Sequence, residues 1–412
     1  MKRTTLLLAI VLFSSTLLSE NIRYAPAMFI KPFFKGLGMY RVTEQELKFY
    51  LNIKVKQPMD IAVTKLETQE IYTLSSYATE RDLGLVAYNP NLAFVFLYGQ
   101  EKFHEKFNAP LGIDASENGS VWVADSENKR IVVLSNNGYK LEYKKHITLE
   151  GKPFDITHDL SGHLYVSLYD TDRVMLLEDG KVITQITDHI ERPKGLKFID
   201  KNDPYNYFKS DFLALVNRDG EQIVTISEGT IKHQIDLKKF FRIPVRINFI
   251  SIDYFSHILA TDEENSCIHK FDRDLNYIAS FNHTEEDSSL YKVQGIDVYK
   301  KYGQLFMVEK TGGRYYWMGM DVIEWEAEYT NKELIIKYRF TDPAFFTLHL
   351  YSSEGEMIRT VFEKKRLDQC RGSIKLKIEI EPGEYILRGK VEPTYSSYKR
   401  FQREIKQKLF VD

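Results

Sequence analysis

The stretch that decides the fold runs from Ala109 to Ile131 and reads APLGIDASENGSVWVADSENKRI. It contains a proline opening, a glycine turn, an alternating apolar run and an acidic turn that ends in arginine. The same order of features returns along the chain in six units. The first residue of each unit is here called its opening, and the openings, 40 to 52 residues apart, are Pro58, Pro110, Pro153, Pro193, Pro244 and Val293. A repeating unit of this length indicates a propeller, a solenoid or an array.

Each unit predicts β-strands rather than helices. Short runs rich in β-branched and aromatic residues follow the openings, as in Val121–Val123 and Leu164–Val166, and Gly, Asn and Asp bound these runs. A further run precedes the next opening, as in Val182–Ile186. Period-two alternation between turn residues is a strand signal. Four antiparallel strands in each of six units predict an all-β, six-bladed β-propeller.

The Pro-x-Gly-Ile opening and the Val-Ala-Asp-x-x-Asn-x-Arg-Ile turn resemble the NHL repeat, and the resemblance covers residues 46–322. An aspartate in this turn can accept hydrogen bonds from backbone N–H groups and face the arginine, while an asparagine tolerates the left-handed backbone that tight turns require. We therefore assign a structural role in turns to Asp125, Asn128, Arg130, Asp170, Arg173 and Asp262.

An acidic cation site is the alternative role for some of these turns. It would be built from Asp170, Asp172, Asp262, Glu263 and Glu264. Carboxylate oxygens suit calcium, but the chain has no Asp-x-Asp-x-Asp-Gly spacing of a calcium loop. We therefore favour the structural interpretation.

The domain plan has four parts. Residues 1–19 have a charged N-terminal region, a short apolar central region and a C-terminal region of small polar residues, which together predict a signal peptide. Residues 20–45 are assigned to an N-terminal extension. The propeller spans 46–322, with 46–55 predicted to close the sixth blade as its outermost strand. Residues 332–412 contain regularly spaced short strands, which predict an immunoglobulin-like β-sandwich.

Turn motifs in the sandwich, at Ser353–Gly355 and Pro382–Tyr385, resemble the Ig-like module of flagellar hook-capping proteins. By analogy, that resemblance implies an envelope or surface-appendage assembly. The signal peptide implies an exported protein of the periplasm, the cell envelope or the extracellular space, with no membrane span once it is removed. We expect Cys267 and Cys370, the two cysteines, to be free thiols.

The residues expected at the rim of the central channel of the propeller bear on whether the protein is an enzyme. The residues directly after the openings are Met59, Leu111, Phe154, Lys194, Val245 and Gln294. Six-bladed propellers include a peptide-amide lyase that binds zinc through histidines at such positions, and none of the six is a histidine, so we reject that activity. The rim is instead a candidate binding surface. His158 and His163 are expected to be exposed turn residues.

Acids near the openings, Asp60, Asp114 and Asp155, leave a calcium site open as an alternative. We favour a role in which they satisfy backbone groups within the blades. The net charge of −2 argues against a nucleic-acid partner. The sequence therefore predicts a non-enzymatic binding or assembly module with a protein partner and no cofactor. The alternative is a calcium-dependent lactonase or esterase with its site in the channel.

Overall fold

The computed structural model describes residues 29–30, 58–63, 71–75, 85–88, 94–98, 107–136, 141–282, 290–301, 303–310, 312–395 and 402–411. These residues form strands almost throughout, with two short helical elements, η2 (Arg218–Gly220) and α3 (Leu237–Phe241). The predicted signal peptide, 1–19, lies outside the described residues. Within them, no helix has the length and apolar character that crossing a membrane requires.

The chain divides into two compact units. The larger one comprises residues 31–277 and 288–317, and the smaller one comprises 1–30, 278–287 and 318–412. Each unit is built from antiparallel sheets, and the larger one carries the repeats.

Six four-stranded sheets follow one another along the described chain. The first sheet contains β2 (Pro58–Val63), β3 (Ile71–Ser75), β4 (Leu85–Tyr88) and β5 (Phe94–Tyr98). The second contains β6 (Pro110–Ala115), β7 (Ser120–Asp125), β8 (Arg130–Asn136) and β9 (Leu141–Thr148). The third contains β10 (Pro153–His158), β11 (Leu164–Leu168), β12 (Arg173–Glu178) and β13 (Lys181–Ile186). The next two are β14 (Leu196–Ile199), β15 (Phe212–Asn217), β16 (Gln222–Ser227) and β17 (Thr230–Asp236); and β18 (Ile247–Ile252), β19 (Ile258–Asp262), β20 (Cys267–Phe271) and β21 (Tyr277–Phe281). The last has the order β22 (Val293–Tyr299), β23 (Gln304–Glu309), β24 (Gly312–Met318) and β1 (Phe29–Ile30).

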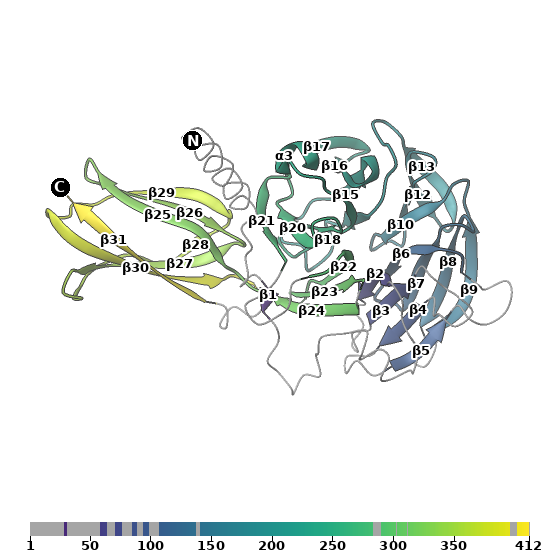
Figure 1. The fold of residues 1–412 in the computed structure, drawn as a ribbon, viewed down its shortest axis with the longest axis horizontal. Coiled ribbons are helices and arrows are strands. Elements are labelled where there is room, and N and C mark those ends of the chain that lie inside the picture. The colour runs from purple at the N-terminus through teal and green to yellow at the C-terminus, as the bar shows by residue number, and fades with distance from the viewer. Residues whose placement is uncertain are drawn as a thin grey trace, which may run out of the picture. The chain divides into compact units, whose positions relative to one another are not determined.

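The first strands of the sheets along the chain, β2, β6, β10, β14, β18 and β22, are the inner strands. Each contacts the next one, and β22 contacts β2, so that the sheets form a closed ring (Figure 1). Repetition around a ring protects the sheet edges that an open stack would expose. The predicted all-β propeller fold is confirmed.

The outermost position of the last sheet differs from the prediction. The strand next to β24 is β1, which comes from residues 29–30. The predicted closing strand, 46–55, lies outside the described residues. An N-terminal segment does take the outer edge of this sheet, but it is an earlier one than the sequence suggested.

The register of the inner strands corrects the fifth opening. Pro110 pairs with Asp125 across β6 and β7, and the equivalent pair across β18 and β19 is Ile247 with Asp262. Both pairs precede the same β-bulge. The fifth unit therefore opens at Ile247, three residues after Pro244, which was the expected opening.

Neighbouring sheets of the ring pack face to face. Trp122 and Ile131 from the β6–β9 sheet share one apolar core with Ile156 and Val166 from the β10–β13 sheet, and all four are buried. Burying an aliphatic or aromatic side chain of this size stabilises a fold by about 1.5–3 kcal/mol. These cores make the ring a rigid support for the side chains along the inner strands.

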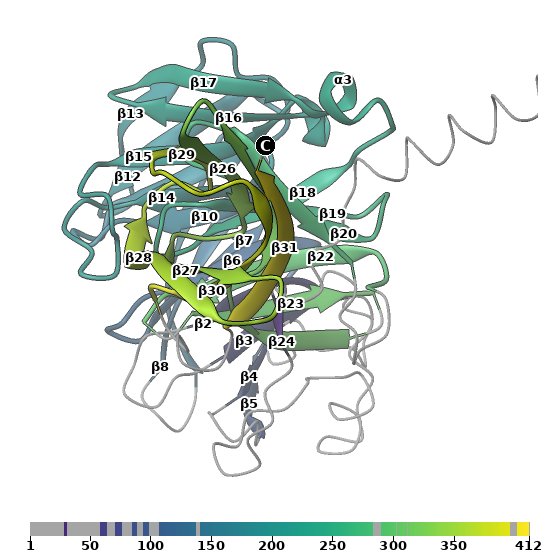
Figure 2. The same ribbon diagram turned by 90° about the vertical axis from the view of Figure 1, so that its left-hand side faces the viewer.

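The smaller unit contains two sheets (Figure 2). One has the order β25 (Val322–Thr330), β26 (Glu333–Phe340) and β29 (Arg371–Lys377). The other has the order β28 (Met357–Leu367), β27 (Ala344–Ser352), β30 (Gly383–Pro393) and β31 (Arg403–Val411). Leu334 and Ile336 of the first sheet share a buried core with Phe346 and Leu348 of the second, which makes this unit a β-sandwich. Strand β25 was not predicted, because it lies almost entirely in residues 323–331, which the sequence assigned to neither the propeller nor the sandwich.

Candidate functional site

The inner strands place equivalent residues in layers around the ring. The first layer, one residue after the openings, consists of Met59, Leu111, Phe154, Lys194, Asn248 and Gln294. The second consists of Asp60, Gly112, Asp155, Gly195, Phe249 and Gly295. The fourth consists of Ala62, Asp114, Thr157, Lys197, Ser251 and Asp297. The layers show which predicted residues come together.

Five of the six predicted rim residues belong to the first layer, and Val245 does not. Val245 is buried in an apolar core with Ile247, because the fifth unit opens three residues later than expected. Asn248 takes its place in the layer. The sequence therefore predicted an apolar residue at a position where the structure has an amide.

Asn248 joins two other residues of the first layer in a polar network. Lys194 Nζ donates to Asn248 Oδ1 at 3.1 Å, and Asn248 Nδ2 donates to Gln294 Oε1 at 3.3 Å. Lys194 Nζ also lies 2.8 Å from Asp219 Oδ1. Burial lowers the pKa of the Lys194 ammonium, and the Asp219 carboxylate opposes that shift. This end of the ring is occupied by buried polar groups that satisfy one another.

The second layer alternates larger side chains with glycines. A Cβ atom on Gly112 would lie 2.3 Å from Asp155 Oδ1, and one on Gly295 would lie 2.3 Å from the Cα atom of Asp60. Glycine is required here because neighbouring backbones approach closely. Burial raises the pKa of the Asp155 carboxyl to about 7. Burial, and then the charge of Asp155, raise the pKa of the Asp60 carboxyl well above its ordinary range.

Carboxylates of the inner strands bind the backbone of the next sheet. Ile113 N–H donates to Asp60 Oδ2 at 2.9 Å, and Leu196 N–H donates to Asp155 Oδ2 at 2.9 Å. Asp114 accepts the corresponding bond from His158 N–H in the next sheet, again at 2.9 Å. The expectation was that these acids would satisfy groups within one blade. They instead join consecutive sheets.

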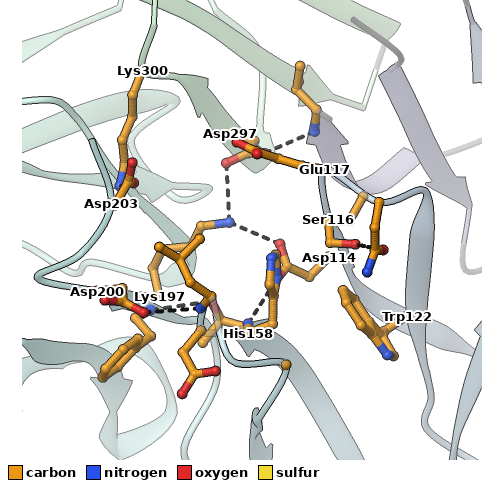
Figure 3. A pocket seen from close by; sticks show the side chains of 18 of the residues that line it. Asp114, Ser116, Glu117, Trp122, His158, Lys197, Asp200, Asp203, Asp297 and Lys300 are labelled. Carbon is orange, nitrogen blue, oxygen red and sulfur yellow. Dashed lines mark hydrogen bonds and ion pairs between the residues drawn. The ribbon is translucent and has the colours of Figure 1, made fainter. Parts of the chain in front are cut away.

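The fourth layer contains an ion-paired lysine between two acids. Lys197 Nζ lies 3.2 Å from Asp114 Oδ1 and 3.3 Å from Asp297 Oδ1 (Figure 3). Burial raises the pKa of the Asp114 carboxyl, but the charges of Lys197 and His158 outweigh burial and hold this pKa below its usual range. Ser251 Oγ donates to Asp297 at 3.1 Å. The ammonium group thus occupies the place between carboxylates that a cation would need.

A pocket of about 290 Å³ opens beside the fourth layer, at the end of the inner strands that lies away from the openings (Figure 3). His158 Nδ1 lies 2.5 Å from Asp114 Oδ2, and the imidazole contacts the ring of Trp122 at a centroid distance of 4.9 Å. Trp122 is buried and His158 is half-buried. The pocket therefore has an aromatic wall and a floor of paired charges.

The lining of the pocket is acidic overall. Six carboxylates line it, against two lysines and His158. Lys300 Nζ pairs with Asp203 at 3.0 Å, and Asp200 accepts the N–H group of Leu160 at 3.1 Å. Concentrated carboxylates at the mouth of a cleft attract cationic groups.

The prediction for His158 was wrong, because this residue ends β10 and lines the pocket. His163 does lie in the β10–β11 turn, but it is only partly exposed, and its Nδ1 atom lies 2.7 Å from Asp159 Oδ2. The sequence contained a usable signal, because Asp114 and Lys197 stand at the same distance after their openings. Asp114 was expected to be a calcium ligand or a partner of backbone groups, so its pairing with Lys197 in the fourth layer was missed.

The predicted turn residues of the second unit lie together. Asp125 is fully buried, and its carboxylate accepts from Asn128 Nδ2 at 2.8 Å and from Arg130 Nε at 2.6 Å. It also accepts the N–H group of Asn108 at 2.7 Å, which fixes the chain as it enters β6. The carboxylate thus links the turn to the start of the sheet.

The fifth unit has an aspartate at the same position, Asp262, which accepts the N–H group of Arg246 at 3.2 Å. In the third unit Leu168 takes this position, and Asp170, two residues later in the turn, accepts the N–H group of Lys152 at 2.6 Å. Arg173 does not reach the acid of its turn in the manner of Arg130. Its Nε atom donates to the carbonyl of Thr171 at 3.2 Å.

The acids of the alternative cation site belong to two different sheets. Asp170 and Asp172 lie in the β11–β12 turn, whereas Asp262, Glu263 and Glu264 lie at the β19–β20 turn. Strand β14 separates the inner strands of these two sheets in the ring. The ring therefore does not gather these acids into one group.

Comparison with known proteins gives one repeat match and several similar solved structures. The NHL repeat family matches residues 107–134. A catalytically inactive virginiamycin B lyase from Staphylococcus aureus, solved with quinupristin, is 14% identical, with 64% of this chain and 95% of that chain covered and a TM-score of 0.44. A streptogramin B lyase is 17% identical, with coverages of 65% and 95% and a TM-score of 0.43.

PorZ, an essential surface component of the type-IX secretion system of Porphyromonas gingivalis, is 10% identical. That alignment covers 89% of this chain and 54% of PorZ, with a TM-score of 0.44. No curated protein matches the sequence. At these identities and TM-scores, the likenesses carry no argument about this chain.

Proposed function

We propose that this chain is an exported, non-enzymatic binding or assembly module of the periplasm or cell envelope. It recognises a protein partner through the faces of the propeller and the sandwich. The observation that supports this proposal most directly is the position of Lys197, whose ammonium group forms ion pairs with both Asp114 and Asp297. A general acid or base needs a proton that it can exchange at working pH, and a carboxylate held in an ion pair is poorly suited to that task.

The pocket provides a point of contact for a partner. Its volume of about 290 Å³ is at the lower limit of small-molecule sites, and its lining is acidic. A lysine or arginine side chain of a partner fits both its size and its charge. Leu160 lines the pocket and is 49% exposed, so an apolar group at the mouth is available for contact.

The alternative function, a calcium-dependent hydrolase, requires several oxygen ligands that converge on a free position. The Asp114 and Asp297 carboxylates do converge in the fourth layer, but Lys197 Nζ lies between them. Asp60 and Asp155 are bound to backbone N–H groups. These contacts favour the binding module over the hydrolase.

Site-specific crosslinking in the producing cell tests the proposal. A photo-crosslinking residue at Leu160 should capture a discrete envelope partner, whereas the same residue at Ile183, which is equally exposed on β13, should not. Charge reversal by Glu117→Lys should reduce the capture, and Asp188→Lys should leave it unchanged. Cell fractionation and N-terminal sequencing of the purified chain would test export separately.

Equal capture at Leu160 and Ile183 would contradict recognition through the pocket. Hydrolysis of lactones or esters that stops on addition of a chelator would contradict the absence of catalysis. A full-length chain in the cytoplasm would contradict export.

A further inference from the structure

The fifth unit departs from the repeat in one turn. In the second unit Asp125 pairs across the strands with Arg130, and the equivalent pair in the fifth unit is Asp262 with Cys267. A thiol cannot neutralise a carboxylate as a guanidinium does. Asp262 is fully buried, so that its charge requires another partner.

His269 supplies that partner. Its Nε2 atom lies 3.1 Å from Asp262 Oδ2 and 3.6 Å from Cys267 Sγ. Cys267 and His269 are two residues apart on β20, and side chains at that spacing project from the same face of a strand. All three side chains are buried, and their donor atoms lie within 4.8 Å of one another.

We infer that Asp262, Cys267 and His269 form a binding site for a zinc-like divalent metal ion. The three donors are a thiolate, an imidazole and a carboxylate, which is a ligand set that zinc accepts. Tetrahedral zinc with ordinary bond lengths separates sulfur from nitrogen by about 3.5 Å and nitrogen from oxygen by about 3.4 Å. In this chain the Sγ–Nε2 distance of 3.6 Å matches its edge, and the Nε2–Oδ2 distance of 3.1 Å is about 0.3 Å shorter than its edge.

The surroundings hold two of the three ligands in place. The ring of Phe241 stacks on His269 at a centroid distance of 4.3 Å and an interplanar angle of 25°. Asn265 Nδ2 donates to Asp262 Oδ2 at 2.6 Å, and the N–H groups of Glu264 and Asn265 donate to Asp262 Oδ1. Groups that orient metal ligands in this way are a regular feature of protein metal sites.

Charge and proton balance also suit a metal. A thiolate, a neutral imidazole and a carboxylate carry two negative charges, which one divalent ion cancels in a buried place. Binding releases the thiol proton to solvent and leaves the imidazole proton on Nδ1, because Nε2 donates its lone pair to the metal. In the metal-free chain, burial and then the charge of Asp262 raise the pKa of the Cys267 thiol well above its ordinary value. A bound cation reverses that tendency.

The inference is independent of the proposed function, because the cluster lies outside the pocket. A Cys-x-His pair that follows an aspartate by five residues is neither a Cys-x-x-Cys motif nor a calcium loop, so the sequence alone did not indicate this site. The competing explanation is that Asp262 and His269 form a purely structural hydrogen bond in place of the missing arginine.

Cobalt and zinc are suitable probes for the full chain. We expect protein produced in cobalt-supplemented medium to contain one ion per chain and to show a thiolate-to-cobalt charge-transfer band. Cys267→Ser should abolish the band and most of the metal content, and Cys370→Ser, which changes the other free thiol, should retain both. Asn265→Ala should lower zinc affinity by about 10–100-fold. Circular dichroism would establish that each variant is folded.

Three outcomes would overturn the site. The first is folded wild-type protein without metal or a charge-transfer band, from cells supplied with either ion. The second is equal metal content in the Cys267→Ser and wild-type chains. The third is loss of the band in Cys370→Ser alone. Partner capture at Leu160 would be unaffected by any of them, so that the metal site and the proposed function fail separately.

Discussion

Lys197 Nζ lies 3.2 Å from Asp114 Oδ1, although 83 residues separate the two in the chain. The same ammonium group lies 3.3 Å from Asp297 Oδ1. The lysine therefore joins three sheets of the ring through one charge. Both carboxylates are buried, and if the lysine were lost, Asp114 would keep only His158 as a charged partner while Asp297 would lose its ion pair.

Lys197→Met should destabilise the fold by about 3 kcal/mol or more, because removing one partner of a buried ion pair leaves the other charge uncompensated. The measurement is urea denaturation at neutral pH. Lys201→Met is the matched control, since Lys201 is 57% exposed and pairs with an exposed acid, and its effect should stay within about 0.5 kcal/mol. A loss below about 1 kcal/mol for Lys197→Met would contradict the role of the pair.

Gly112→Ala should destabilise the chain by about 2 kcal/mol or more, because the new Cβ atom would lie 2.3 Å from Asp155 Oδ1 and 2.6 Å from the Asp155 Cα atom. Relief of this contact requires β6 and β10 to move apart. Gly162→Ala is a useful comparison, since nothing lies within 4 Å of its Cβ position, and only its φ of +89° opposes the change. We expect about 1 kcal/mol there. Equal melting temperatures for the two variants would contradict the close approach of the sheets.

The ring could be predicted from the sequence because its signals are local. The alternation and turn residues between Pro110 and Ile131 depend on neighbours along the chain, and each unit repeats them. The sandwich strands were found for the same reason. Strand β25 was missed because Val322–Thr330 alternates apolar residues with glutamates and lies where a linker was expected.

The candidate site could be predicted only in part. Pro244 looked like the fifth opening, but α3 and its C-cap residue Arg242, at a φ of 59°, lead the chain into β18 only at Ile247. The sequence therefore predicted Val245, and not Asn248, in the first layer. The contact of Lys197 with Asp114 joins strands from different sheets, and it becomes visible only when the inner strands are set in a ring.

Substitutions of Asp125 should separate its two roles. Asn217 takes the equivalent place in the fourth unit, and its Oδ1 atom accepts the N–H group of Glu191 at 2.8 Å. Asp125→Asn should therefore keep the bond to Asn108 and lose only the charge pair with Arg130, at a cost of about 1 kcal/mol. Asp125→Ala should lose both and cost about 3 kcal/mol. Denaturant titration of both variants measures the difference, and an equal loss for the two would show that the backbone bond contributes little.

The raised pKa of Asp155 predicts a pH dependence of stability. Burial raises this pKa to about 7 in the folded chain, above the value of about 3.9 expected when unfolded. The folded state therefore binds the Asp155 proton more tightly than the unfolded state does. The stability that this protonation contributes is complete below about pH 3.9 and is lost as the pH rises through 7. Asp155→Asn removes the ionisable group, so the drop in unfolding free energy from pH 5 to pH 8 should be smaller than in the wild type by on the order of 2 kcal/mol. Urea titrations at several pH values measure this slope, with Asp188→Asn, at an exposed site, as the control. Parallel curves for wild type and Asp155→Asn would show that Asp155 ionises in the fold as readily as in the unfolded chain.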